Sequence, residues 1–78
     1  MKICGYNCHG LGSSSAIRSL QHIRRHHRPE ILFLSETHLD KGSGERLRIN
    51  LGYSHMWVVP SNGRAGGLMM LWDQHVRI

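Results

Sequence analysis

Apolar residues in this chain form short runs that are separated by polar and glycine-rich stretches. The clearest run covers residues 31–34, and the polar segment Ser35-Glu36-Thr37 follows it directly. A short apolar run that comes after a proline predicts a strand buried on both faces. Open α/β sheets bind ligands at the carboxyl ends of their strands, so Glu36 is a candidate site residue. The plain alternative is an acid at the start of an ordinary loop.

An alternating segment and a helical segment precede this strand. Residues 2–7 predict a strand that ends at Asn7, and serines 13–15 offer caps for a helix that runs up to Pro29. The apolar face of this helix consists of Ala16, Ile17, Leu20, Ile23 and His27. Because a helix joins them, the two strands should be parallel and linked by a right-handed crossover. Asn7 and Glu36 are then expected at the same edge of the sheet.

The second half of the chain predicts a short helix followed by antiparallel strands. Ser43 is expected to cap the helix, and Gly52 suits its C-terminal end. Strands are expected over residues 53–59, 66–72 and 75–78, with a hairpin turn at Asn62-Gly63 between the first two. Parallel and antiparallel parts together predict a mixed sheet and an α/β fold. The final strand lacks a cap or turn, which indicates a fragment of a larger domain.

The length of 78 residues allows one small domain of marginal stability. Cys4 and Cys8 lie ~13 Å apart if residues 2–7 are extended, which is too far for a disulfide or a shared metal ion. We therefore expect two free thiols. The longest apolar run, residues 68–72, is too short to cross a membrane, and the first residues do not resemble a secretion signal. An intracellular location, nuclear or cytoplasmic, is expected.

The net charge of +5, with seven histidines besides, favours acidic partners such as nucleic acid. The predicted helix carries a basic face, which consists of Arg18, Arg24, Arg25 and Arg28. A solvated helix surface is the simpler interpretation of these arginines. His22 and His26 stand one helical turn apart and could hold a metal ion, but the sequence adds no third ligand nearby.

Three segments of the chain resemble one family of nucleases. Residues 6–12 (YNCHGLG) resemble the W-N-C-R-G-L-G opening of plant non-LTR (LINE-type) retrotransposon endonuclease domains. Residues 29–37 (PEILFLSET) resemble their second motif, and residues 59–72 resemble the hairpin that follows it. These domains belong to the endonuclease/exonuclease/phosphatase family, with apurinic/apyrimidinic endonucleases and pancreatic deoxyribonuclease. The resemblance therefore spans the whole chain.

The resemblance implies an α/β fold, the N-terminal part of a four-layer α/β sandwich of mixed sheets and flanking helices. It also implies Mg²⁺-dependent cleavage of phosphodiester bonds in DNA. Glu36 matches the metal-binding glutamate of the family, and Asn7 matches the asparagine that orders the metal site and the scissile phosphate. Both are thus candidate catalytic and metal residues. Such a site suits Mg²⁺, which keeps several waters and needs only one or two carboxylates.

The chain departs from the family at Tyr6, His9 and His38, where tryptophan, arginine and lysine are usual. The later motifs of the family supply an Asp/Asn pair and an Asp–His pair, and no segment of this sequence matches them. Residues 1–78 are therefore expected to be a partial domain, truncated at the C-terminus and catalytically inactive alone. Exposed strand edges should favour self-association.

Three other interpretations stay open. A strand, a Gly10-x-Gly12 loop and a helix also begin a Rossmann dinucleotide-binding unit, but Ser15 replaces the third glycine of that motif. A basic module that binds nucleic acid or a protein partner without catalysis would account for the net charge. A retrotransposon relic with no function would carry the same motifs and the same fold.

Overall fold

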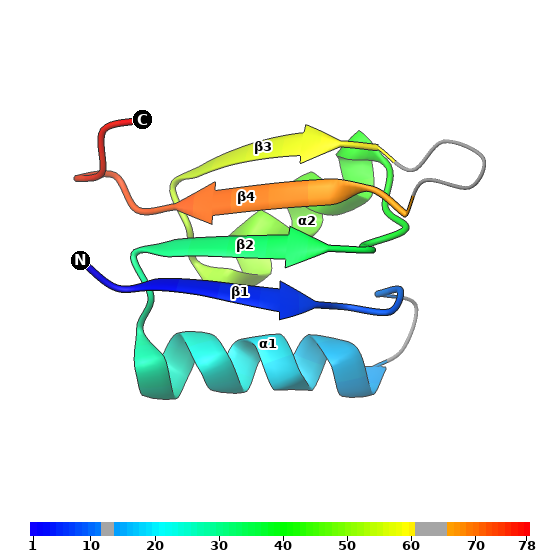
Figure 1. Cartoon of the computed structure of the whole chain (residues 1–78), viewed down its shortest axis with the longest axis horizontal. Helices are drawn as coiled ribbons and strands as arrows, with labels where there is room; N and C mark the ends of the chain where they lie inside the picture. Colours follow the sequence, from blue (N-terminus) through cyan, green and yellow to red (C-terminus); the bar gives the residue numbers. More distant parts are fainter. Residues whose placement is uncertain (12–13, 61–65) are drawn as a thin grey trace.

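Two helices and a four-stranded sheet make up the part of the chain that the computed structural model describes, residues 1–11, 14–60 and 66–78. In chain order the elements are β1 (Ile3–Asn7), α1 (Ser14–His27), β2 (Ile31–Ser35), α2 (Lys41–Leu51), β3 (His55–Val59) and β4 (Leu68–Trp72). Figure 1 shows the strands side by side, with α1 below β1 and α2 behind the sheet.

The sheet has the strand order β1-β2-β4-β3. Strand β1 pairs in parallel with β2, whereas β4 pairs antiparallel with both β2 and β3. The mixed sheet that the sequence predicts is therefore confirmed, and so is the α/β class. Strand β4 comes after β3 in sequence but lies between β2 and β3.

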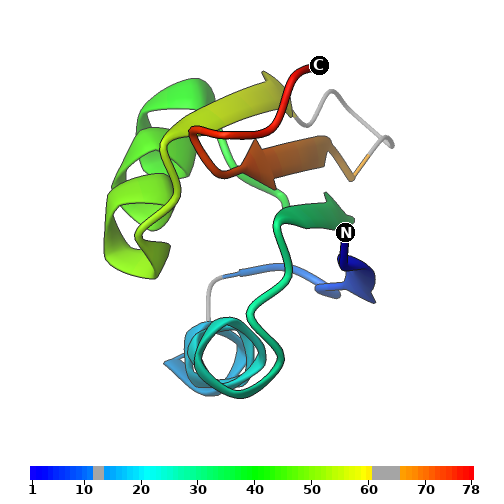
Figure 2. The same cartoon turned by 90° about the vertical axis from the view of Figure 1, so that its left-hand side faces the viewer.

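The core lies between the helices and one face of the sheet. Figure 2 shows both helices on the same side of the strands. Helix α1 contributes Leu20 and β2 contributes Leu32 and Leu34, and all three side chains have no exposed surface. Helix α2 adds Leu47 and Leu51, as its apolar spacing predicts.

The other face of the sheet, which we call the open face, carries no helix in the described parts of the chain. It consists of every second strand residue: Ile3, Gly5, Asn7, Ile31, Phe33, Ser35, His55, Trp57, Val59, Leu68, Met70 and Trp72. Phe33 is 39% exposed and Trp57 is 52% exposed. The expectation that β2 is buried on both faces is therefore wrong, because both helices cover the same side.

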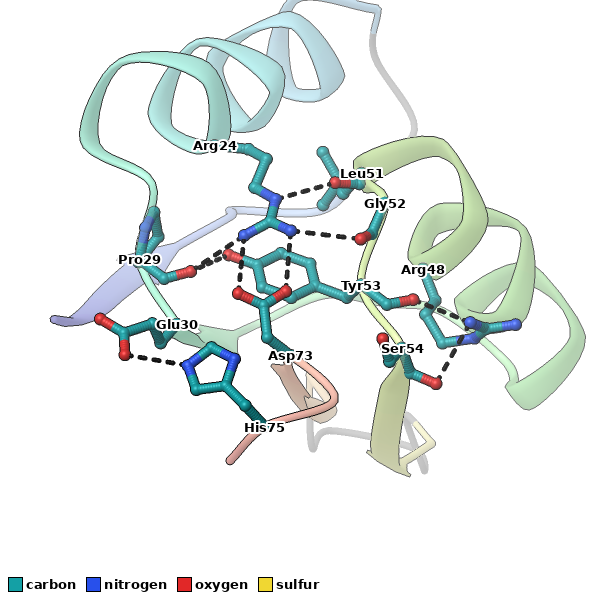
Figure 3. A network of polar contacts seen from close by, with 10 residues as sticks. All are labelled: Arg24, Pro29, Glu30, Arg48, Leu51, Gly52, Tyr53, Ser54, Asp73 and His75. Atoms are coloured by element: carbon teal, nitrogen blue, oxygen red, sulfur yellow. Dashed lines mark hydrogen bonds and ion pairs between the residues drawn. The ribbon is translucent and has the colours of Figure 1, made fainter. Parts of the chain in front are cut away.

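Arg24 joins four segments of the chain near the start of β2 (Figure 3). Its guanidinium donates hydrogen bonds to the carboxylate of Asp73 and to the backbone oxygens of Pro29, Leu51 and Gly52. The guanidinium also lies 3.9 Å from the ring centroid of Tyr53, whose hydroxyl donates to the Pro29 oxygen at 2.8 Å. Burial opposes the charge of Arg24, but the hydrogen bonds and charge interactions with Asp73 and Tyr53 together outweigh this effect and raise the pKa.

Helix α2 begins at a different cap from the predicted one. Asp40 is the N-cap, and its carboxylate accepts a hydrogen bond from the Ser43 N–H at 2.7 Å. A carboxylate at this place complements the positive helix N-terminus better than a hydroxyl does. The bond from Ser43 lowers the pKa of Asp40. Gly52 ends the helix as predicted, in the left-handed conformation with a φ of 77°.

Strands β3 and β4 begin later than predicted. Residues 53 and 54 stay outside β3, because the Arg48 guanidinium binds both of their carbonyl oxygens. Strand β4 begins only after Gly67, whose φ of 84° is incompatible with an extended strand. The hairpin turn predicted at Asn62-Gly63 lies outside the described residues.

Residues 75–78 do not form the further strand that the sequence predicts. The Val76 N–H donates to the Asp73 oxygen at 3.1 Å, and this bond closes a turn directly after β4. Because Arg24 holds the Asp73 side chain, the chain turns away from the sheet at this point.

Both cysteines are free thiols, as expected, with Cys4 half-buried and Cys8 buried. Burial raises the pKa of Cys8 to about 11, so this thiol stays protonated at neutral pH. Within the described residues, no helix is long and apolar enough to cross a membrane.

Candidate functional site

The two candidate residues lie at the same edge of the sheet, as the strand–helix–strand order predicts. The parallel register pairs Asn7 with Ser35, so Glu36 follows directly at the end of the neighbouring strand. The pairing continues past the strands, because the Gly10 N–H donates to the Glu36 oxygen at 2.7 Å and the Leu11 N–H to the Thr37 oxygen at 3.1 Å. The loops after β1 and β2 thus form one connected surface.

The Asn7 side chain organises the loop after β1. Its Oδ1 accepts a hydrogen bond from the His9 N–H at 3.1 Å, a contact typical of an Asx turn. His9 then adopts a left-handed conformation, with a φ of 49°. One lone pair of the amide oxygen is thus already used, and the side chain stays exposed to solvent.

The Glu36 carboxylate points into a partly open environment, with a side-chain exposure of 51%. Its Oε2 lies 3.5 Å from the His9 Nδ1. Within the described residues, this contact is the single ion pair that Glu36 forms. Gly66 packs directly against the Glu36 backbone: a Cβ added to Gly66 would lie 3.0 Å from the Glu36 Cα. A larger residue at position 66 would have to displace the Glu36 backbone by a few tenths of an ångström. Gly66 therefore allows a close approach to Glu36, on the side opposite to the loop after β1.

Left-handed residues concentrate at this edge of the sheet. The non-glycine residues His9, Glu36 and His38 have φ values of 49°, 51° and 54°. Each such conformation costs about 1 kcal/mol for a residue with a Cβ. Conformations of this kind persist where the surroundings enforce them, and they are frequent at functional sites.

Thr37 contributes a polar atom without a partner. Its side chain is fully buried, and within the described residues its hydroxyl has no hydrogen-bond partner. The next residue, His38, packs against Gly10, where an added Cβ would lie 3.4 Å from the imidazole Cδ2. The edge therefore carries an acid, an amide, a buried hydroxyl and two imidazoles on adjoining loops.

The oxygen donors at this edge fit a weakly held, largely hydrated Mg²⁺ ion. Glu36 supplies one carboxylate and Asn7 supplies one amide oxygen, and Mg²⁺ can bind through one or two carboxylates while it keeps several waters. The described residues contain no group of three or more histidine, cysteine or acidic side chains that could hold a metal ion.

A second acid–histidine pair lies away from this site. His75 Nε2 lies 3.2 Å from Glu30 Oε2, next to the start of β2 rather than its end (Figure 3). The Lys2 N–H donates to the same carboxylate, and together with His75 it lowers the pKa of Glu30. Because β2 separates them, this pair cannot assist chemistry at Glu36.

The basic face of α1 differs from the predicted one. Arg18, Arg25 and Arg28 are exposed, but Arg24 is committed to Asp73 and to backbone oxygens. A spacing of four separates Ala16, Leu20 and Arg24, so the sequence already placed this arginine in the apolar stripe. The rings of His22 and His26 lie 4.2 Å apart on the same helix, and the described residues add no third ligand.

Sequence reasoning missed Gly66 and Thr37 as parts of the site. Gly66 was expected inside a strand, and only the three-dimensional contact with Glu36 reveals its role. The burial of Thr37 depends in the same way on the turn taken by the chain after β2. His9 and His38 stood out in the sequence as departures from the family pattern, and both lie at the site.

No protein-family model matches the chain, and no curated protein matches its sequence. The resemblance to retrotransposon endonucleases therefore stays a hypothesis, and the candidate site rests on its own residues and their geometry.

Proposed function

We propose that the chain is an endonuclease-like domain of the endonuclease/exonuclease/phosphatase class. On this proposal it represents the N-terminal part of a four-layer sandwich, and Asn7 and Glu36 form its Mg²⁺-binding corner. The substrate class is a phosphodiester in DNA. The chain by itself would bind the metal ion weakly and would not cleave DNA.

One observation carries the proposal: the parallel register that brings Asn7 and Glu36 to one edge of the sheet. Two motifs that are far apart in sequence thereby converge, as a shared site requires. The unpartnered Thr37 hydroxyl and the left-handed Glu36 at the same edge add support. A dinucleotide-binding unit is less well supported, because β4 next to β2 runs antiparallel.

The residues of the corner have separable tasks. A bound Mg²⁺ would neutralise negative charge on a phosphate. Glu36 would hold the ion through its carboxylate, and Asn7 would orient the adjoining loop through its bond to the His9 N–H. His9 would have to release the carboxylate, since it now contacts Oε2.

Cleavage needs further groups that this edge does not offer. Within the described residues, Glu36 is the only acid there, and the other acid–histidine pair lies near the start of β2. An attacking water would have no general base in position. Losing such groups typically reduces turnover by several orders of magnitude.

A Mg²⁺ titration followed by ¹⁵N–¹H NMR tests the metal-binding corner. We expect shift changes that cluster at Asn7, Glu36 and their loop neighbours, with a dissociation constant of about 1 mM or weaker. The Glu36→Gln variant should abolish them. The matched control Glu45→Gln lies on α2 and should leave them unchanged. Shifts that are absent, or that persist in Glu36→Gln, would reject the proposed site.

A plasmid-nicking assay tests the expected inactivity. The chain should not convert supercoiled DNA to the nicked form in ~10 mM Mg²⁺ (on the order of ten times the tightest dissociation constant expected). Nicking that disappears in Glu36→Gln would support the nuclease class but contradict the inactivity.

Binding to nucleic acid without catalysis is the second candidate. All five acidic side chains are engaged within the chain, in ion pairs or in the cap of α2. The exposed arginines of α1 therefore face solvent without an acidic partner among the described residues. Fluorescence anisotropy with a DNA duplex should then show affinity that falls steeply as salt rises. An affinity independent of salt, or none at low salt, would exclude this candidate.

A further inference from the structure

The open face is a broad apolar surface without formal charge. None of its twelve residues is lysine, arginine, aspartate or glutamate, and eight of them are large and apolar. A sheet whose face is apolar gains stability when a second layer covers it. Surfaces of this kind on small proteins mark interaction sites.

We infer that two copies of the chain pack through their open faces and form a two-sheet dimer. This inference concerns the chain by itself. In the four-layer sandwich of the proposed function a second sheet would cover the same face, and Asn7 lies at the margin of that face, so the dimer is tested without Mg²⁺ and through Trp57 rather than through the proposed metal corner. The dimer also differs from self-association through strand edges, because the side chains of the face, and not the backbone of β1 or β3, make the contact.

The distribution of charge favours a second copy as the occupant. The exposed Arg18 and Arg25 belong to α1, and Arg28 follows its last residue. Helix α1 lies on the covered side of the sheet (Figure 2). In a face-to-face dimer the helices form the two outer layers, so the positive charges of the copies stay far apart. A nucleic acid or an acidic peptide would find no cationic side chain on the open face.

The shape of the face is complementary to itself. The middle row across the sheet, in register, reads Gly5, Phe33, Met70 and Trp57. Gly5 leaves a gap at one end, since an added Cβ would meet only the Phe33 oxygen, at 4.0 Å. Trp57 at the other end projects and is 52% exposed. A two-fold axis parallel to the strands, between β2 and β4, places each Trp57 over the partner's Gly5.

The size of the face sets the expected strength of the dimer. Four strands spaced ~4.8 Å apart, with five residues of ~3.3 Å each, give a flat area of ~300 Å² per copy. Two such faces bury less than the ~1,600 Å² of a standard interface. The dimer should therefore be weak, with a monomer at about 10 µM and a dimer near 1 mM.

Sedimentation velocity between those two concentrations tests the dimer. The sedimentation coefficient should rise with concentration, and tryptophan emission should shift to the blue as Trp57 becomes buried. Trp57→Lys should weaken association at least tenfold. Ile49→Lys is the matched control, because Ile49 is equally apolar and 63% exposed but lies on α2.

Several outcomes would overturn the inference. A monomer at 1 mM would do so, as would open-ended assemblies. A dimer that Trp57→Lys does not weaken would indicate pairing through the strand edges. Far-UV circular dichroism of both variants establishes that they are folded.

A measurement on the native sequence tests the register independently of any variant. A mixed sample of labelled and unlabelled chains at 1 mM should show intermolecular NOEs between the Trp57 indole and the Gly5 α-protons. Contacts between the two Trp57 rings instead would overturn the proposed two-fold axis.

Discussion

Arg24 connects parts of the chain that are far apart in sequence. Its guanidinium bonds to the C-terminal end of α2, to the segment before β2 and to Asp73 after β4. Planar geometry allows it to bind several oxygens at once while it lies over the Tyr53 ring. Lysine, with a single ammonium group, cannot reproduce these contacts.

We predict that Arg24→Lys lowers the free energy of unfolding by about 2 kcal/mol, since one ammonium group cannot bond to Asp73 and to the backbone oxygens of Leu51 and Gly52 at the same time. A domain of this size has only about 3–5 kcal/mol of stability from its core, so the loss is large. Urea unfolding followed by tryptophan fluorescence measures it. The neighbouring Arg25→Lys, on the exposed side of α1, should change stability by less than about 0.5 kcal/mol. Equal effects of the two variants would contradict the role of Arg24.

At the scale of elements, helix α2 depends on its surroundings more than on its own sequence. Gly42 and Gly44 stand in its first turn, where glycine lowers helix stability. The Asp40 cap and the burial of Leu47 and Leu51 offset this weakness. The two glycines differ in their surroundings, and this difference gives a test.

We predict opposite effects for alanine at these two positions. An added Cβ at Gly42 would meet no atom closer than 3.7 Å, so Gly42→Ala should stabilise the protein by about 0.5–1 kcal/mol. At Gly44 it would lie 3.0 Å from the Val58 Cγ2 on β3, so Gly44→Ala should destabilise by about 1 kcal/mol. Thermal unfolding of both variants measures the difference. A gain in stability from Gly44→Ala would contradict this prediction, because it would show that Val58 on β3 can shift to accommodate the added methyl group at little cost.

The elements that could be predicted from sequence are those set by local patterns. The apolar spacing located α1, and the strand–helix–strand order placed Asn7 beside β2. Long-range contacts decided the rest: Arg48 delays the start of β3, and Arg24 turns the chain away at Asp73. The one-sided burial of β2 was unpredictable for the same reason, because it depends on where both helices pack.

In the candidate site, too, some residues could be predicted from the sequence and others only from the folded structure. Glu36 and Asn7 follow from their positions at strand ends, and the register supports their proximity. The contact of Gly66 with Glu36 and the burial of Thr37 arise from loops that approach each other only in the folded chain. No periodic pattern encodes such contacts.

For the whole molecule, stability should depend on pH in the alkaline range through two buried groups. Burial raises the pKa of Cys8 from 9.0 to about 11 and that of Tyr53 from 10.0 to about 12. The unfolded chain therefore ionises these groups first, and stability falls as the pH rises above 9. By pH 11 we expect Cys8 alone to remove about 2 kcal/mol. Urea unfolding at a series of pH values measures this slope, which should flatten between pH 9 and 11 in Cys8→Ala. An unchanged slope in that variant would contradict the assignment.

In the acidic range the free energy of unfolding should rise with pH, opposite to its dependence in the alkaline range. The folded state lowers the pKa of Glu30, Asp40 and Glu45, through the bonds from Lys2, Ser43 and Arg48 respectively. As the pH falls below about 4.5, the unfolded chain takes up protons first. The same series should therefore show stability that falls as the pH decreases below about 4.5.

The strand order also has a consequence for how the chain folds during synthesis. Strand β4 is the last of the four strands to leave the ribosome, yet it is the central partner that joins β2 to β3. Until it emerges, β3 has no neighbour to pair with, and the core formed by β1, α1, β2 and α2 lacks Met69 and Leu71 of β4. Contacts between β2 and β4 span more than thirty residues. The chain must therefore lose the entropy of closing this long loop before these contacts can stabilise it. The nascent polypeptide should consequently stay exposed to chaperones and proteases until β4 has emerged and paired with β2 and β3.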